Sequence, residues 1–234
     1  MGKMGAGYGS EFHLLRYLGY HRHELNRAVE KETRGRVIDW LDLAFGHKKK
    51  LDREWAGLDF LDATSDVKSA WVKFWPHSGN VPNWDAVGLL ETPSRVEYVL
   101  VEAKAHAEEL RSSCSAKKKG GLDTIRDALM ATIKTSQSTA DIENWLRPYY
   151  QYANRLVHLH FLLQNNTPVR LVFIYFCGDD WGGRTLPNGE PPKCPKDEGE
   201  WDTCLHEMYN HLGLNGHSEL ESRVHRLFPH IRHG

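Results

Sequence analysis

Two short apolar runs that carry charged side chains constrain the fold of this chain more than any other feature. Asn83–Leu90 and Tyr98–Ala105 are rich in apolar residues and bounded by turn formers, which predicts two β-strands. Asp85 lies at the start of the first run, and Glu102 and Lys104 lie near the end of the second. Because side chains alternate along a strand, Glu102 and Lys104 share one face of the sheet. The sequence therefore predicts two carboxylates and an ammonium group on neighbouring strands.

This set of groups is suited to metal-assisted hydrolysis. Mg²⁺ prefers oxygen ligands, and Asp85, Glu102 and the carbonyl oxygen of Ala103 would supply three. Such an ion, or Mn²⁺ in its place, acidifies a bound water and polarises a phosphoryl oxygen. Lys104 could orient the water or stabilise the negative charge that develops on the phosphate. We therefore predict a metal site able to hydrolyse a phosphodiester.

A structural interpretation of the same residues stays open. Lys104 could instead pair with Glu102 or Asp85 as a cross-strand salt bridge at the end of the sheet. An acid-x-lysine triplet is a weak signal by itself, because Asp66-Val67-Lys68 has the same pattern. No buried strand precedes that second triplet. The apolar strand ahead of Glu102 and the acid on the strand before it favour the catalytic interpretation.

The pattern before the paired strands predicts mainly helices. A helical pattern runs from Ser10 to about Thr33 with an interruption at Gly19, and an amphipathic stretch over Val37–Ala44 follows. Ala70–Trp75 is apolar and aromatic and is stopped by a proline, which predicts a strand. Together with the two charged strands, this segment would form a three-stranded antiparallel meander.

The second half of the chain alternates between helical and strand patterns. A basic, small-residue loop over residues 112–121 precedes the remaining elements. We expect helices over Leu122–Ile133 and from Pro148 to Leu163, a central strand at Val169–Phe176, a loop over 179–199, and two short helices at Trp201–Leu212 and Ser218–Phe228.

Asp85 followed 102 − 85 = 17 residues later by Glu102-Ala103-Lys104 resembles the PD-(D/E)xK, or restriction-endonuclease-like, nuclease superfamily. The order of helix, acid-bearing meander, helix and strand over roughly residues 10–176 is similar too. The resemblance implies an α/β fold with a mixed central β-sheet flanked by helices, here with extra C-terminal helices. It also implies Asp85 and Glu102 as metal ligands, Lys104 as the catalytic lysine, Mg²⁺ as cofactor and DNA as substrate. Such nucleases often act as homodimers.

Members of that superfamily often add an acid from the first helix. Glu24 is the candidate here, with Glu11 and Glu30 behind it. One departure is Trp84, which stands before Asp85 where the motif's name has proline. Many members of the superfamily lack that proline.

Some exonuclease-type members carry a glutamine and a tyrosine on the later helix. Gln151 matches the glutamine, whereas Arg155 stands where the tyrosine would be. Lys117, Lys118 and Lys119 lie in the loop downstream of Lys104, where we expect them to contact a phosphate backbone. Such contacts would make binding strongly dependent on salt.

The domain organisation follows from the same pattern. We expect a flexible tail over residues 1–9 and a single domain over residues 10–234. That domain would contain an inserted basic loop and helix over 112–140 and a C-terminal extension over 179–234. No linker or internal repeat divides the chain.

Composition limits the other classes of function. The formal net charge is −1, so any nucleic-acid surface must be local. No run of about 18 apolar residues exists and the first residues lack a signal-peptide core, so we expect a cytoplasmic protein without a membrane partner. Cys194, Cys204, His206 and His211 could share zinc, but their spacing matches no common module, and reduced thiols are favoured. The alternatives to a DNA nuclease are a non-catalytic nucleic-acid- or protein-binding module with this fold, and a hydrolase of other phosphoesters.

Overall fold

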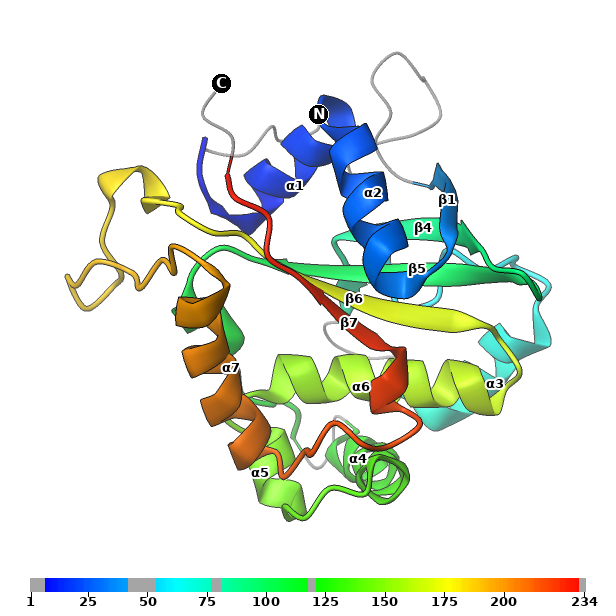
Figure 1. Cartoon of the computed structure of the whole chain (residues 1–234). Coiled ribbons are helices and arrows are strands. Elements are labelled where there is room, and N and C mark those ends of the chain that lie inside the picture. The colour runs from blue at the N-terminus through cyan, green and yellow to red at the C-terminus, as the bar shows by residue number, and fades with distance from the viewer. Residues whose placement is uncertain (1–6, 42–53, 77–80, 118–120, 232–234) are drawn as a thin grey trace.

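The structure is a computed structural model that describes residues 7–41, 54–76, 81–117 and 121–231. Its centre is a mixed five-stranded sheet with helices on both faces, as Figure 1 shows. The strand order is β1 (Arg36–Trp40), β4 (Ala86–Glu91), β5 (Val96–Lys104), β6 (Val169–Tyr175) and β7 (Val224–Leu227). β1, β4 and β5 pair antiparallel, whereas β5, β6 and β7 pair parallel. The predicted α/β class with a mixed central sheet flanked by helices is confirmed.

Alternation along β5 decides which side chains meet which layer of helices. Val99 and Val101 pack into a core with the N-terminal helices, whereas Leu100 packs into the core on the other face. Glu102 and Lys104 have the parity of Leu100, so they point toward the second face. The first face is covered by α1 (Gly9–Gly19) and α2 (Arg22–Thr33). The second is covered by α3 (Asp66–Phe74), α4 (Leu122–Ser136), α5 (Ile142–Leu146), α6 (Tyr150–Gln164) and α7 (Glu198–His211).

The prediction of a first meander strand at Ala70–Trp75 is wrong, because residues 70–74 belong to helix α3 and Trp75 directly follows its last residue. Ser65 caps this helix by accepting a hydrogen bond from the Val67 amide at 3.3 Å. Trp71 and Trp75 lie one helical turn apart and stack with their ring centroids 5.7 Å apart. An aromatic run thus buries one helical face here, and the meander begins with β1 instead.

Two further predictions of helix are also wrong. Most of the Val37–Ala44 stretch that the structure describes lies in β1, which pairs with β4. In the C-terminal segment Ser218–Phe228, a short 3₁₀ turn at Glu221–Arg223 leads into β7. Leu220, Val224 and Leu227 have helical spacing, but hydrogen bonding to the edge of β6 overrides that local preference.

The longer periodic segments follow the sequence predictions. α1 and α2 are separated after Gly19, α4 covers the predicted range, and β6 is a central strand. α6 begins at Tyr150, two residues after the predicted start at Pro148, and extends through Leu163 as predicted. α7 covers the predicted Trp201–Leu212 helix. Within the described ranges, none of the helices has both the length and the apolar character that crossing a lipid bilayer requires.

Candidate functional site

The structure brings Asp85 to the end of β5. Asp85 lies between the two-residue strand β3 (Asn83–Trp84) and β4, and its amide donates to the Val101 carbonyl at 3.1 Å. Two residues after Val101, the Ala103 amide donates to Asp85 Oδ2 at 2.7 Å. The side chain of Asp85 thus takes the place of a backbone acceptor where the β4–β5 ladder ends. As a result, the acid of the first strand lies beside the Glu102-Ala103-Lys104 segment of the second.

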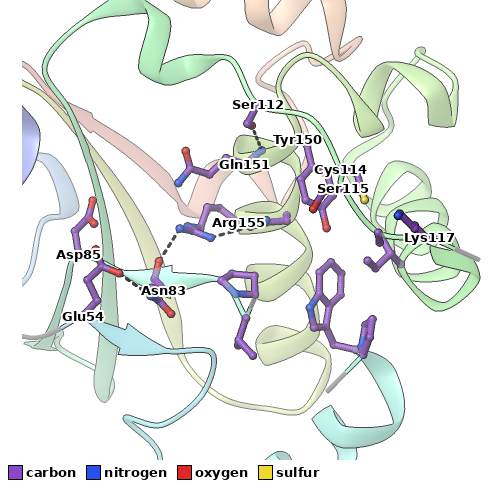
Figure 2. Close-up of a pocket in the computed structure, with 17 residues that line it drawn as sticks. Glu54, Asn83, Asp85, Ser112, Cys114, Ser115, Lys117, Tyr150, Gln151 and Arg155 are labelled. Atoms are coloured by element: carbon purple, nitrogen blue, oxygen red, sulfur yellow. Dashed lines mark hydrogen bonds between the residues drawn. The ribbon is translucent and has the colours of Figure 1, made fainter. Parts of the chain in front are cut away.

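Glu102 is buried, and cations bind both of its oxygens. Lys104 Nζ pairs with Glu102 Oε1, and Arg155 Nε donates to Glu102 Oε2 at 2.8 Å. Arg155 comes from α6 and also donates to the Asn83 carbonyl at 2.6 Å, as Figure 2 shows. Its guanidinium lies 4.8 Å from the centroid of the Trp84 ring. The salt bridge expected by the structural interpretation is therefore present, and Arg155 reinforces it.

The two acids have opposite pKa shifts. Burial, followed by the neighbouring Glu102 carboxylate, raises the pKa of Asp85 to about 8. Burial would also raise the pKa of Glu102, but Arg155 and Lys104 outweigh it and lower that pKa. For Lys104, burial opposes the charged form, yet Glu102 and Asp85 raise the pKa overall. Near neutral pH the site therefore contains an ionised Glu102, a charged Lys104 and an Asp85 that retains its proton.

Asp85 lines a pocket of about 1150 Å³. Figure 2 shows Asp85, Asn83 and Glu54 on one side and Tyr150, Gln151 and Arg155 of α6 facing them. The lining also includes Ser112, Cys114, Ser115, Lys117, Asn154, Trp75 and Ile125. Glu102 and Lys104 do not line this pocket but border a void of about 10 Å³ behind it, which Gln151 also borders. Of the two acids predicted as metal ligands, Asp85 is thus the one that faces the pocket directly.

The structure brings some of the remaining sequence candidates to the pocket and not others. Gln151 and Lys117 line it, whereas Lys118 and Lys119 lie outside the described residues. Glu24 lies on α2, which packs on the opposite face of the sheet, with its carboxylate 3.6 Å from His21 Nδ1.

The buried side chains of Leu25 and Val29 hold α2 on that opposite face. The structure therefore does not bring Glu24 to Asp85 and Glu102. The two acids considered behind it do not line the pocket either. Glu11 is exposed on α1, and Glu30 accepts a hydrogen bond from the Val37 amide at 2.9 Å.

Sequence reasoning missed Glu54, the other acid that lines the pocket. Asn83 Nδ2 donates to Glu54 Oε2 at 2.6 Å. The two-residue strands β2 (Trp55–Ala56) and β3 pair antiparallel, with Trp55 opposite Trp84. Continuing this register by one residue sets Glu54 opposite Asp85. Only the mirrored order of Glu54-Trp55 and Trp84-Asp85 could have signalled the pairing.

The groups around Asp85 offer oxygen donors, which are the ligand type that a hard cation takes. Mg²⁺ takes oxygen ligands, keeps several waters and needs only one or two carboxylates. Because the Ala103 amide faces Asp85 while the Lys104 carbonyl accepts from Phe176 on the other side, the Ala103 carbonyl faces the Asp85 side as well. In the part of the chain described, no group of three or more His, Cys, Asp or Glu side chains could hold a metal ion. Cys194, Cys204, His206 and His211 therefore do not form the zinc site that the sequence left open. The oxygen donors near Asp85 are the remaining candidate for a metal site.

Comparison with protein-family models, with curated proteins and with solved structures finds no match to this chain. The interpretation of the pocket therefore depends on the geometry described above.

Proposed function

We propose that this chain is a Mg²⁺-dependent nuclease that hydrolyses DNA phosphodiester bonds, with a restriction-endonuclease-like fold of the PD-(D/E)xK superfamily. The observation that carries the proposal is the 2.7 Å hydrogen bond from the Ala103 amide to Asp85. It joins the acid of one strand to the Glu102-Ala103-Lys104 segment of the next at the edge of a large pocket. This is the juxtaposition that hydrolysis at a metal-activated water requires.

Each residue has a role that its surroundings support. Asp85, Glu102 and the Ala103 carbonyl would hold Mg²⁺, or Mn²⁺ in its place. When bound, the ion would supply an acidified water and polarise a phosphoryl oxygen. Asp85 must release its proton to act as a ligand, so its raised pKa makes cation binding favour alkaline pH. Lys104 stays charged and can orient the water or stabilise the charge on the phosphate.

The pocket itself suits a polymeric anion. At about 1150 Å³ it exceeds the roughly 300–1,000 Å³ of most small-molecule sites. Lys117 provides a cation for the phosphate backbone, while Gln151 and Ser115 provide neutral hydrogen-bonding groups. We expect two copies of the chain to act on the two strands of a duplex.

The test is cleavage of plasmid and linear DNA in the presence of Mg²⁺, Mn²⁺ or a chelator. We expect cleavage only with metal, and loss of cleavage in Asp85→Asn and Lys104→Met. Glu91→Gln is the matched control, because Glu91 is an exposed acid of β4 that pairs with Arg36. Cleavage that persists in Asp85→Asn, or that Glu91→Gln abolishes equally, would contradict the assignment. A parallel panel of small phosphoesters separates a nuclease from a hydrolase of other phosphoesters.

A second candidate is a non-catalytic module that keeps this fold and binds nucleic acid or a partner protein. The observation that favours it is Arg155, which binds the Glu102 oxygen that Lys104 leaves available. A cation at Glu102 would have to share that oxygen with a guanidinium group. This candidate predicts salt-sensitive DNA binding without cleavage, and no calorimetric binding of Mn²⁺ even at pH 9, where Asp85 is ionised.

A further inference from the structure

Three arginines converge on one buried carboxylate at the other end of β5. Glu97 is 3% exposed and accepts from Arg170 Nε at 2.6 Å and from Arg95 Nε at 3.1 Å. Arg223 Nη1 donates to both oxygens, at 3.2 and 3.3 Å. We call these three arginines with Glu97 the arginine cluster. They gather at the N-terminal ends of β5, β6 and β7, which is the end of β5 opposite to Lys104 (Figure 1).

The arginine cluster has a surplus of positive charge. Three guanidinium groups and one carboxylate sum to 3 − 1 = +2. His225 Nε2 lies 3.3 Å from Arg170 Nη1, and burial followed by the charges of Arg170 and Arg223 lowers the pKa of this histidine to about 4. His225 is therefore neutral at pH 7. Among the residues that the structure describes, Glu97 is the one acid that pairs with these arginines, so about two charges lack a counter-ion.

The arginine cluster also has N–H groups that do not bond to Glu97. Arg95 and Arg170 use Nε on Glu97, and Arg223 uses one Nη, whereas each guanidinium carries five N–H groups. The side chains of Arg95, Arg223 and Arg170 are 47%, 25% and 17% exposed, so part of each guanidinium reaches solvent. Because Glu97 already orders the three side chains, little conformational entropy is lost when an anion binds to them.

We propose that the arginine cluster binds a phosphate dianion, either as inorganic phosphate or as a phosphomonoester. Such a group carries a charge of about −1.5 to −2 at neutral pH, which balances the surplus, and offers three terminal oxygens to three guanidinium groups. The site is separate from the pocket at Asp85, and the proposal does not depend on nuclease activity. The phosphate could be free inorganic phosphate or the terminal phosphate of a nucleic-acid strand, which have the same chemistry.

The test is calorimetric titration of the full chain with inorganic phosphate, and separately with a short oligonucleotide with or without a 5′-phosphate. Arg95→Gln and Arg223→Gln each remove one guanidinium and leave two cations on Glu97, so the fold is retained. Arg226→Gln is the matched control. Arg226 is on β7 and 42% exposed, but it pairs with Asp202 at 3.4 Å. We expect the dissociation constant to rise about tenfold in each cluster variant and to change less than about twofold in the control.

The arms of this experiment separate the outcomes. Tighter binding of the phosphorylated than of the unphosphorylated oligonucleotide, lost in Arg223→Gln, identifies a strand end as the source. Binding of inorganic phosphate without that preference identifies free phosphate. Absence of saturable phosphate binding by the unmodified chain would overturn the proposal. Equal binding by Arg95→Gln, Arg223→Gln and Arg226→Gln would overturn it as well. Thermal unfolding of each variant without phosphate shows whether a lost site is only a lost fold.

Discussion

Glu97 and Glu102 are glutamates of the same strand with nearly equal burial, at 3% and 2% exposed, and their surroundings differ in kind. Among the residues that the structure describes, Glu97 meets three arginines and no second acid, so its end of β5 has surplus positive charge. Glu102 meets Lys104, Arg155 and the carboxyl group of Asp85, so the charges there balance only if both acids ionise. The comparison shows that burial of a carboxylate does not decide its role. The neighbouring charges do.

The largest expected effect concerns catalysis. If the proposed nuclease function holds, Glu102→Gln should lower metal-dependent DNA cleavage by about 10³-fold, because it removes a proposed metal ligand and the partner of Lys104. Glu97→Gln should leave the rate per folded molecule within a few-fold of the unmodified protein. Single-turnover cleavage measured well below the unfolding temperature of each variant checks both. Equal losses in the two variants would remove the functional distinction between the ends of β5.

Stability should show the reverse order. Glu97→Gln leaves three guanidinium groups without a counter-ion, and we expect a loss of about 2–3 kcal/mol, reduced by their partial exposure to solvent. Glu102→Gln should cost less, because Asp85 can then ionise and pair with Lys104. Urea unfolding at pH 7 in phosphate-free buffer measures both. A greater loss in Glu102→Gln would mean that Asp85 cannot replace the missing charge.

The raised pKa of Asp85 makes stability depend on pH. Because the folded pKa is about 8 and the unfolded value is about 3.9, the folded state retains a proton that the unfolded state has released between these values. The contribution of Asp85 to stability should therefore fall as pH rises from about 4 to about 8 and level off above. It is measured as the difference between the unmodified chain and Asp85→Asn, because His158 and His225, with pKa values lowered to about 3 and about 4, act in the opposite direction below about pH 6.5. Asp85→Asn should lack this decline and be more stable than the unmodified chain at pH 8. Unfolding curves at several pH values with a chelator present check this, and parallel profiles for the two proteins would contradict it.

The smallest expected effect is at the pocket wall. Lys117→Ala should weaken DNA binding a few-fold and reduce the slope of log K against log salt by about 1. Lys31→Ala, an exposed lysine of α2 on the other face of the sheet, is the control and should change neither. Fluorescence anisotropy over a range of salt concentrations measures both. An equal effect of the two substitutions would mean that Lys117 contributes only general charge.

Local patterns in the sequence predicted one part of this structure and missed another. The charged strands, α6 and β6 were predictable because each is long enough for its periodicity to be distinct. β7 is four residues long and depends on pairing with β6. α3 has the aromatic composition of a strand and becomes helical where Ser65 caps it and Trp71 and Trp75 pack.

The same division holds within the site. Asp85, Glu102 and Lys104 were found because they interrupt apolar strands, which is a local signal. The position of Glu54 opposite Asp85, in contrast, is set by the pairing of the short strands β2 and β3, each two residues long. The bond between Arg155 and Glu102 joins residues 53 apart in the chain, so neither the position of Glu54 nor that bond could be read from neighbouring residues.

The contacts of Arg155 have a consequence for how the protein forms. This residue bonds to Asn83, 72 residues earlier, and to Glu102, 53 residues earlier. Contacts between such distant segments form late, because the entropy of closing the intervening loop must be overcome first. During synthesis, Asp85 and Lys104 leave the ribosome well before α6 exists to complete the network. An incomplete chain therefore carries Asp85 and Lys104 without the contacts of Arg155 that complete the network, and the proposed site is assembled only when the domain closes.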